Sequence, residues 1–183
     1  RSGNNLSFTQ GHIQDWEPAP GAGVLLSNSA LQWVPGHEEL LARWARALES
    51  GSWIAVQVPG NFGAPSHALM RELAGSPRYA RALAGVLRGT DSVAEPEEYL
   101  ELLLNAGFDA DVWETSYSQV LTGPDPVLDW VRGTALRPVM AALDPEEYPA
   151  FESAYGALLR EAYPPKPWGT VMPFRRIFMV AHK

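Results

Sequence analysis

Two short apolar runs on either side of an amphipathic helix constrain the fold of this chain more than any other feature. Residues 24–28 and 52–60 are continuous apolar runs, which are typical of strands covered on both faces. Between them, residues 35–50 repeat Leu41, Trp44 and other apolar side chains at helical spacing, and a glycine follows. A strand, a helix and a strand at this spacing predict a crossover connection and a parallel sheet.

The rest of the chain extends this pattern without an internal repeat. Three further strands are predicted, at residues 6–11, 109–121 and 175–183. Helices are predicted at residues 66–76, 77–88 and 95–108, and two or three more between residues 124 and 163. This order favours an α/β fold with a doubly wound, mostly parallel sheet, an antiparallel C-terminal strand and a helical insert at about residues 122–172. We expect one domain over residues 1–183.

Composition excludes several classes of partner. The chain has 183 residues, a net charge of −7 and a pI near 5.1, so it lacks the basic surface that nucleic acid requires. No apolar run approaches the ~20 residues of a membrane span. The absence of cysteine rules out disulfides and thiolate metal sites, and we expect a cytoplasmic protein of undetermined oligomeric state.

Five stretches, in one order along the chain, resemble a known family. They read SNSALQWVPGH, VQVPGNFGAPSHALMRE, AGFDADVWETSY, LDWVRGTALRPV and PFRRIFMVA. They resemble the class I S-adenosylmethionine-dependent methyltransferases, and among these the family that methylates trans-aconitate. The resemblance runs from about Leu6 to the end and implies a Rossmann-like fold. The family's glycine-rich loop and the acidic residue after its second strand are absent. We therefore expect that the N-terminal strands are missing here and that the chain alone is inactive.

The resemblance also implies a reaction. S-adenosylmethionine is the expected co-substrate, without a metal, and the product is a methyl ester on trans-aconitate or a similar polycarboxylic acid. Because a carboxylate is already ionised at neutral pH, no general base is needed and no catalytic side chain is expected. Two alternatives stay open: a methyltransferase of the same fold with another small acceptor, and a non-catalytic fragment that binds a partner.

The expected cofactor residues lie at the carboxyl ends of two predicted strands, where ligands of open parallel sheets bind. By resemblance, Gly11, His12 and Ile13 lie against the adenine, and Asn28 and Ser29 lie under the methionine part. His12 as an ordinary exposed loop residue is an equal alternative. Asn28 as a residue that only caps a turn is another.

The expected acid-binding residues are mostly cationic, since the planar fork of arginine binds carboxylates well. Gln32 and Trp33 follow the corner at Asn28 and are candidate walls of the acceptor site, although Trp33 in the core is an alternative. The remaining candidates lie on a helix, in the insert and at the start of the last strand: His67, Arg71, Arg137, Arg175 and Arg176. For each arginine, a solvated surface position is equally open.

Overall fold

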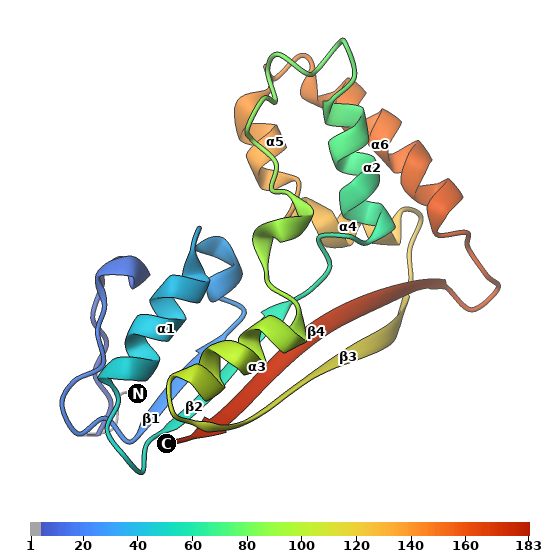
Figure 1. The fold of residues 1–183 in the computed structure, drawn as a ribbon. Coiled ribbons are helices and arrows are strands. Elements are labelled where there is room, and N and C mark those ends of the chain that lie inside the picture. Colours follow the sequence, from blue (N-terminus) through green and yellow to red (C-terminus); the bar gives the residue numbers. More distant parts are fainter. Residues whose placement is uncertain (1–4) are drawn as a thin grey trace. The chain divides into compact units, whose positions relative to one another are not determined.

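The computed structural model of the chain describes residues 5–183 and divides into two compact units (Figure 1). Unit 1 comprises Arg1–Val58, Ala94–Trp113 and Phe178–Lys183, of which the first four residues are not described. Unit 2 comprises Pro59–Val93 and Glu114–Ile177.

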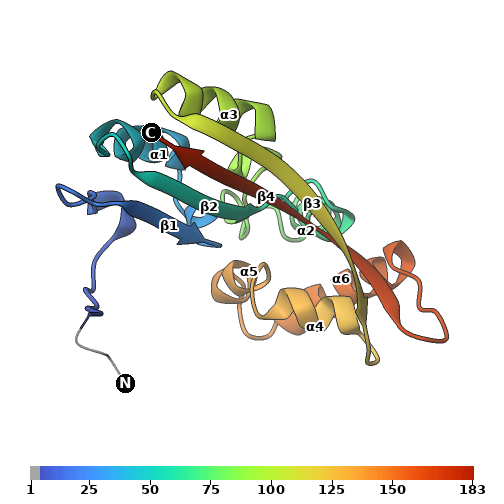
Figure 2. The same cartoon turned by 90° about the horizontal axis from the view of Figure 1, so that it is seen from below.

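Four strands form one sheet in the order β1-β2-β4-β3. They are β1 (Val24–Asn28), β2 (Trp53–Pro59), β3 (Asp109–Leu121) and β4 (Thr170–His182). β1 and β2 are parallel, with Asn28 opposite Gln57. β4 runs the other way (Figure 2), since Gly51 N–H donates to the carbonyl of Lys183 at 2.6 Å and Gly60 N–H to that of Arg175 at 3.0 Å. The α/β class and the antiparallel last strand are thereby confirmed.

In unit 1 two helices pack against each other beside the sheet, α1 (His37–Ala47) and α3 (Pro96–Asn105). A reciprocal capping box of Glu95 and Glu98 begins α3. Alternate strand residues such as Ile54 are fully buried, whereas Val24 and Leu26 are 65% and 76% exposed. The expectation that both faces of the strand at residues 24–28 are covered is therefore not met within the described residues.

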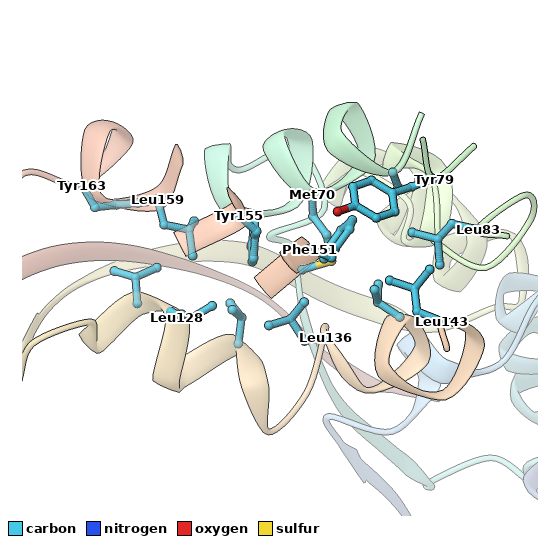
Figure 3. Packing of buried hydrophobic residues seen from close by; sticks show 14 of the residues in the cluster. Met70, Tyr79, Leu83, Leu128, Leu136, Leu143, Phe151, Tyr155, Leu159 and Tyr163 are labelled. Atoms are coloured by element: carbon cyan, nitrogen blue, oxygen red, sulfur yellow. The ribbon is translucent and has the colours of Figure 1, made fainter. Parts of the chain in front are cut away.

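Unit 2 is built around the helices α2 (Pro65–Ala74), α4 (Pro126–Arg132), α5 (Arg137–Ala142) and α6 (Tyr148–Ala162). Three of them lie between β3 and β4, where the sequence predicts two or three. Their apolar faces meet in one cluster around Phe151 and Tyr155, both fully buried (Figure 3). α2 packs chiefly on α6, so the insert and the helix after β2 share this core.

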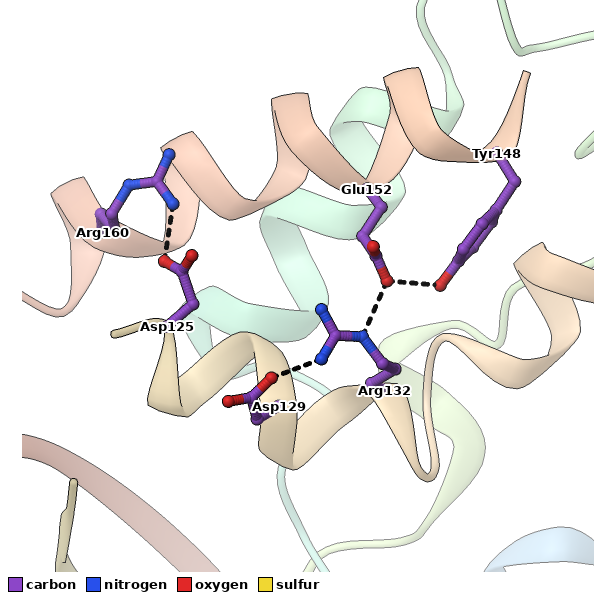
Figure 4. A network of polar contacts seen from close by, with 6 residues as sticks. All are labelled: Asp125, Asp129, Arg132, Tyr148, Glu152 and Arg160. Carbon is purple, nitrogen blue, oxygen red and sulfur yellow. Dashed lines mark hydrogen bonds and ion pairs between the residues drawn. The ribbon is translucent and has the colours of Figure 1, made fainter. Parts of the chain in front are cut away.

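A polar network on the surface joins α4 to α6 (Figure 4). Arg132 pairs with Asp129 and donates to Glu152 at 2.9 Å, which also accepts from the hydroxyl of Tyr148 at 2.8 Å. The hydrogen bond from Arg132 holds the pKa of the Glu152 carboxyl below its usual range. Because these groups lie at the surface, the network contributes orientation more than stability.

Two predicted elements are wrong. Residues 6–11 form no strand and belong to none of the four strands of the described sheet, and Phe8 is 82% exposed. Residues 77–88 form successive turns rather than a helix. Gly85, with φ +71°, departs from helical backbone geometry there, and Tyr79 and Leu83 still reach the core of unit 2.

Within residues 5–183, no helix is long and apolar enough to span a bilayer.

Candidate functional site

A strained corner follows β1 in unit 1. Among the described residues, Ser29 is the one residue other than glycine with a positive φ, +52°. Its N–H donates to the carbonyl of Gln57 at 2.9 Å, and its hydroxyl donates to the side-chain oxygen of Gln57 at 2.9 Å. Asn28 and Gln57 are paired across the parallel strands, so the corner lies at their carboxyl edge. Non-glycine residues in this conformation cost about 1–3 kcal/mol and concentrate at functional sites.

The corner also holds buried acceptors. The side-chain amide of Gln32 donates to the carbonyl of Ser29 at 2.9 Å, and Gln32 is only 4% exposed. Within the part of the chain that the structure describes, neither the side-chain oxygen of Gln32 nor the hydroxyl of Ser27 has a hydrogen-bond partner. Buried polar atoms without partners are rare in folded proteins, so these two acceptors mark the corner as a candidate site.

A buried histidine follows the corner along the chain and is hydrogen-bonded to a buried tyrosine. His37 is 1% exposed; its Nδ1 lies 3.3 Å from the carbonyl of Val34, and its Nε2 lies 2.6 Å from the hydroxyl of Tyr99. Since Nδ1 faces a carbonyl, which can only accept, the neutral ring carries its proton there and Nε2 accepts from the hydroxyl of Tyr99, which also accepts the N–H of Ala94 at 3.2 Å. Burial raises the pKa of Tyr99. The pair links α1 to α3. Helix α1 begins at His37, shortly after Leu31–Trp33, the 3-10 helix that contains Gln32.

The other residues of unit 1 that the sequence singles out are more exposed. Trp33 is 51% exposed, so the alternative that it lies in the core is wrong. His12 is exposed and precedes Ile13–Asp15, a 3-10 helix, whose last N–H bonds to the carbonyl of His12 at 3.1 Å. Gly11 is also exposed, and their contact with adenine stays a prediction.

In unit 2, His67 lies near the start of α2 and is mostly buried. Its Nδ1 is 3.2 Å from the hydroxyl of Ser66, and its ring meets that of Phe62 edge-on at 5.5 Å between centroids. Burial, followed by the charge of Arg71, lowers the pKa of His67 to about 4. His67 and Arg71 are therefore close, as their spacing predicts, but His67 is neutral at pH 7.

The four arginine candidates of unit 2 have different surroundings. Arg175 donates from Nε to Glu114 at 2.8 Å, and Arg176 lies over the ring of Phe174 at 4.9 Å. Arg71 donates to the carbonyl of Arg88 at 3.4 Å. Arg137 begins α5 and is exposed.

The structure thus brings Ser29 and Gln32 together in unit 1, and His67 and Arg71 together in unit 2. Sequence reasoning missed Gln57, His37 and Tyr99. For Gln57 a signal existed, because a parallel register places the end of β2 beside Asn28. The His37 and Tyr99 pair, 62 residues apart, had none.

Comparison with known proteins adds the family. The chain is 54% identical to a trans-aconitate 2-methyltransferase of Streptomyces coelicolor over 183 residues, which are 99% of this chain and 60% of that protein. It is 54% identical to the trans-aconitate 2-methyltransferase of Rhodococcus jostii over 171 residues, which are 92% of this chain and 67% of that protein.

The chain belongs to the trans-aconitate 2-methyltransferase family. A family member from Mycobacterium tuberculosis is 49% identical, with 96% of this chain and 68% of that protein covered. The chain thus spans 60 to 68% of the length of these relatives. No protein-family model matches the sequence. A solved phosphoethanolamine N-methyltransferase 2 of Haemonchus contortus covers 88% of this chain at 14% identity, with a TM-score of 0.39, and adds no argument.

No cluster of three or more His, Asp or Glu side chains suited to a metal ion occurs among residues 5–183.

Proposed function

We propose that the protein containing this chain transfers a methyl group from S-adenosylmethionine to a carboxylate of trans-aconitate or a similar polycarboxylic acid. The observation that carries the proposal is the 54% identity to the Rhodococcus jostii enzyme over 92% of this chain. In this reaction a carboxylate oxygen bonds to the methyl carbon while the carbon–sulfur bond breaks, which gives a methyl ester and S-adenosylhomocysteine. The proposal includes a cytoplasmic location for the enzyme, and an acid substrate that is free in solution.

The corner after β1 fits the methyl donor. S-adenosylmethionine supplies a methyl group activated by a sulfonium, and its methionine part carries an ammonium that can donate hydrogen bonds. The side-chain oxygen of Gln32 and the hydroxyl of Ser27 are buried acceptors at this edge. We therefore assign Gln32, with Asn28 and Ser29, to the donor side rather than to the acid. Gly11, His12 and Ile13 remain the proposed adenine contacts.

The residues of unit 2 supply positive charge for an anionic substrate. A polycarboxylate keeps spare carboxylates that need cationic partners, and Arg71, Arg137, Arg175 and Arg176 are permanently charged. His67 is neutral at pH 7, so it offers a single hydrogen bond and no charge. Since the attacking carboxylate is already ionised, the side chains act by holding and orienting it.

The test is labelled methyl transfer by the natural protein that contains these residues. With S-adenosylmethionine labelled in the methyl group, we expect label in trans-aconitate in a form released by mild alkali, as an ester is. A catechol and a quinone precursor serve as comparison acceptors. Label on a ring acceptor and none on the acid would overturn the proposal.

Arg137→Ala tests one acid contact. Loss of a charge-assisted hydrogen bond of ~1.5 kcal/mol should raise KM for the acid about tenfold, with KM for S-adenosylmethionine nearly unchanged. Arg81→Ala is the matched control, because Arg81 is also an exposed arginine of unit 2. Equal KM values for the acid in both variants would remove Arg137 from the site.

A further inference from the structure

The main chain of Arg175, in the strand β4, is held by a single buried side chain. Asn61 is 5% exposed, and its oxygen accepts the N–H of Arg175 at 2.7 Å while its amide donates to the carbonyl of Arg175 at 2.9 Å. The N–H of Gly60 donates to the same carbonyl at 3.0 Å. Both polar groups of Arg175's main chain are therefore satisfied by the segment that directly follows β2.

The side chain of Arg175 packs closely against Gly60. A Cβ atom on Gly60 would lie 3.1 Å from Cδ and 3.3 Å from Cγ of Arg175. Those contacts are tight, so glycine at position 60 leaves room for the aliphatic stem of Arg175. Asn61 therefore holds the main chain of Arg175, and Gly60 leaves space for its side chain.

The guanidinium already binds a carboxylate. Its Nε and Nη2 both donate to one oxygen of Glu114, in the neighbouring strand β3, at 2.8 and 2.5 Å. The side chains of Arg175 and Glu114 are 25% and 46% exposed. An ion pair with this exposure contributes little to stability, so another carboxylate can displace Glu114 at low cost.

We propose that Glu114 competes with the substrate's carboxylate for Arg175, and that Asn61 and Gly60 position Arg175 for this exchange. The inference rests on the proposed function, because it takes a polycarboxylic acid as the ligand. Glu114 thereby sets the affinity of the site for its acid: it keeps the guanidinium paired until a bidentate carboxylate replaces it.

The first test is Glu114→Gln, which keeps the shape of the side chain and removes its charge. By calorimetric titration with trans-aconitate, the natural protein should bind the acid about two- to fivefold more tightly after this change, the range that an exposed ion pair represents. Asp125→Asn is the matched control. It also removes one negative charge from unit 2, but its partner is Arg160 at 2.6 Å, and we expect unchanged affinity.

The second test asks whether the effect passes through Arg175. In an Arg175→Ala background, Glu114→Gln should change acid affinity no more than Asp125→Asn does, because the competition no longer exists. Asn61→Ala should weaken acid binding in the presence of Arg175 and leave it unchanged in the Arg175→Ala background. Its KM for S-adenosylmethionine should stay constant, which a general loss of folding would not allow.

These outcomes separate the inference from the proposed function. Acid binding that is tightened by Glu114→Gln without any methyl transfer would overturn the proposed function and support the exchange at Arg175. Methyl transfer to the acid, with Glu114→Gln binding no more tightly than Asp125→Asn, would overturn the exchange alone. A tightening that persists in the Arg175→Ala background would overturn it as well.

Discussion

Replacing Phe151 with alanine is expected to lower the free energy of unfolding by about 3–5 kcal/mol. Phe151 is fully buried in the cluster of unit 2, where its ring meets Tyr79 edge-on at 5.0 Å and Tyr155 at 6.3 Å between centroids. The substitution removes these contacts and leaves a cavity between α2 and α6 that rigid neighbours fill only in part. Urea unfolding of the variant and the parent protein gives the difference.

The matched control is Met140→Ala, because Met140 is an apolar residue of the same unit that is 52% exposed. Its effect should stay within about 0.5 kcal/mol. A loss below about 1 kcal/mol for Phe151→Ala would show that α2 and α6 are not held by this cluster. That result would matter for function, because α2 carries His67 and Arg71.

Acidification is expected to destabilise the protein through His67. Its folded pKa is about 4, against 6.5 for the unperturbed group, with burial as the main cause and Arg71 as the second. Between these two values the unfolded chain binds a proton that the folded chain does not, so stability falls as the pH drops. The loss begins near pH 6.5 and is complete near pH 4. Between pH 7 and pH 5 it amounts to about 2 kcal/mol.

His67→Gln isolates this contribution, since the variant keeps every carboxylate but cannot take up the proton. Urea unfolding at pH 7 and pH 5 should show a loss about 2 kcal/mol smaller in the variant than in the parent. The same loss in both proteins would mean that His67 titrates normally and can carry charge toward an anion. The expected result leaves charge neutralisation to the arginines.

Local patterns in the sequence were sufficient for most of the fold. The helices at α1 and α3 follow from apolar spacing and end signals, and β3 matches its predicted bounds at both ends. The helix predicted at residues 77–88 is absent although the apolar spacing there is helical, and Gly85 has φ +71°, which lies outside helical geometry. The strand predicted at residues 6–11 is wrong because a strand needs a neighbouring strand to pair with, and a local sequence pattern does not show whether one is present.

The candidate site was less predictable for a related reason. The corner at Asn28 and Ser29 could be anticipated because a parallel strand delivers its carboxyl end there. The strain at Ser29 and the bonds from Gln57 depend on a neighbouring strand. Asn61 and Glu114 depend on contacts with Arg175 from 114 and 61 residues away. Such contacts come from the tertiary fold, and neither residue type nor spacing predicts them.

One measurement tests directly whether a carboxylate oxygen of the acid receives the methyl group. The natural protein is given S-adenosylmethionine with a trideuterated methyl group and trans-aconitate whose carboxylates carry oxygen-18. Alkaline hydrolysis of the product should release trideuterated methanol that contains oxygen-18, because the methyl carbon bonded to the acid's own oxygen. Methanol with oxygen-16, or no deuterium in an ester of the acid, would contradict the account.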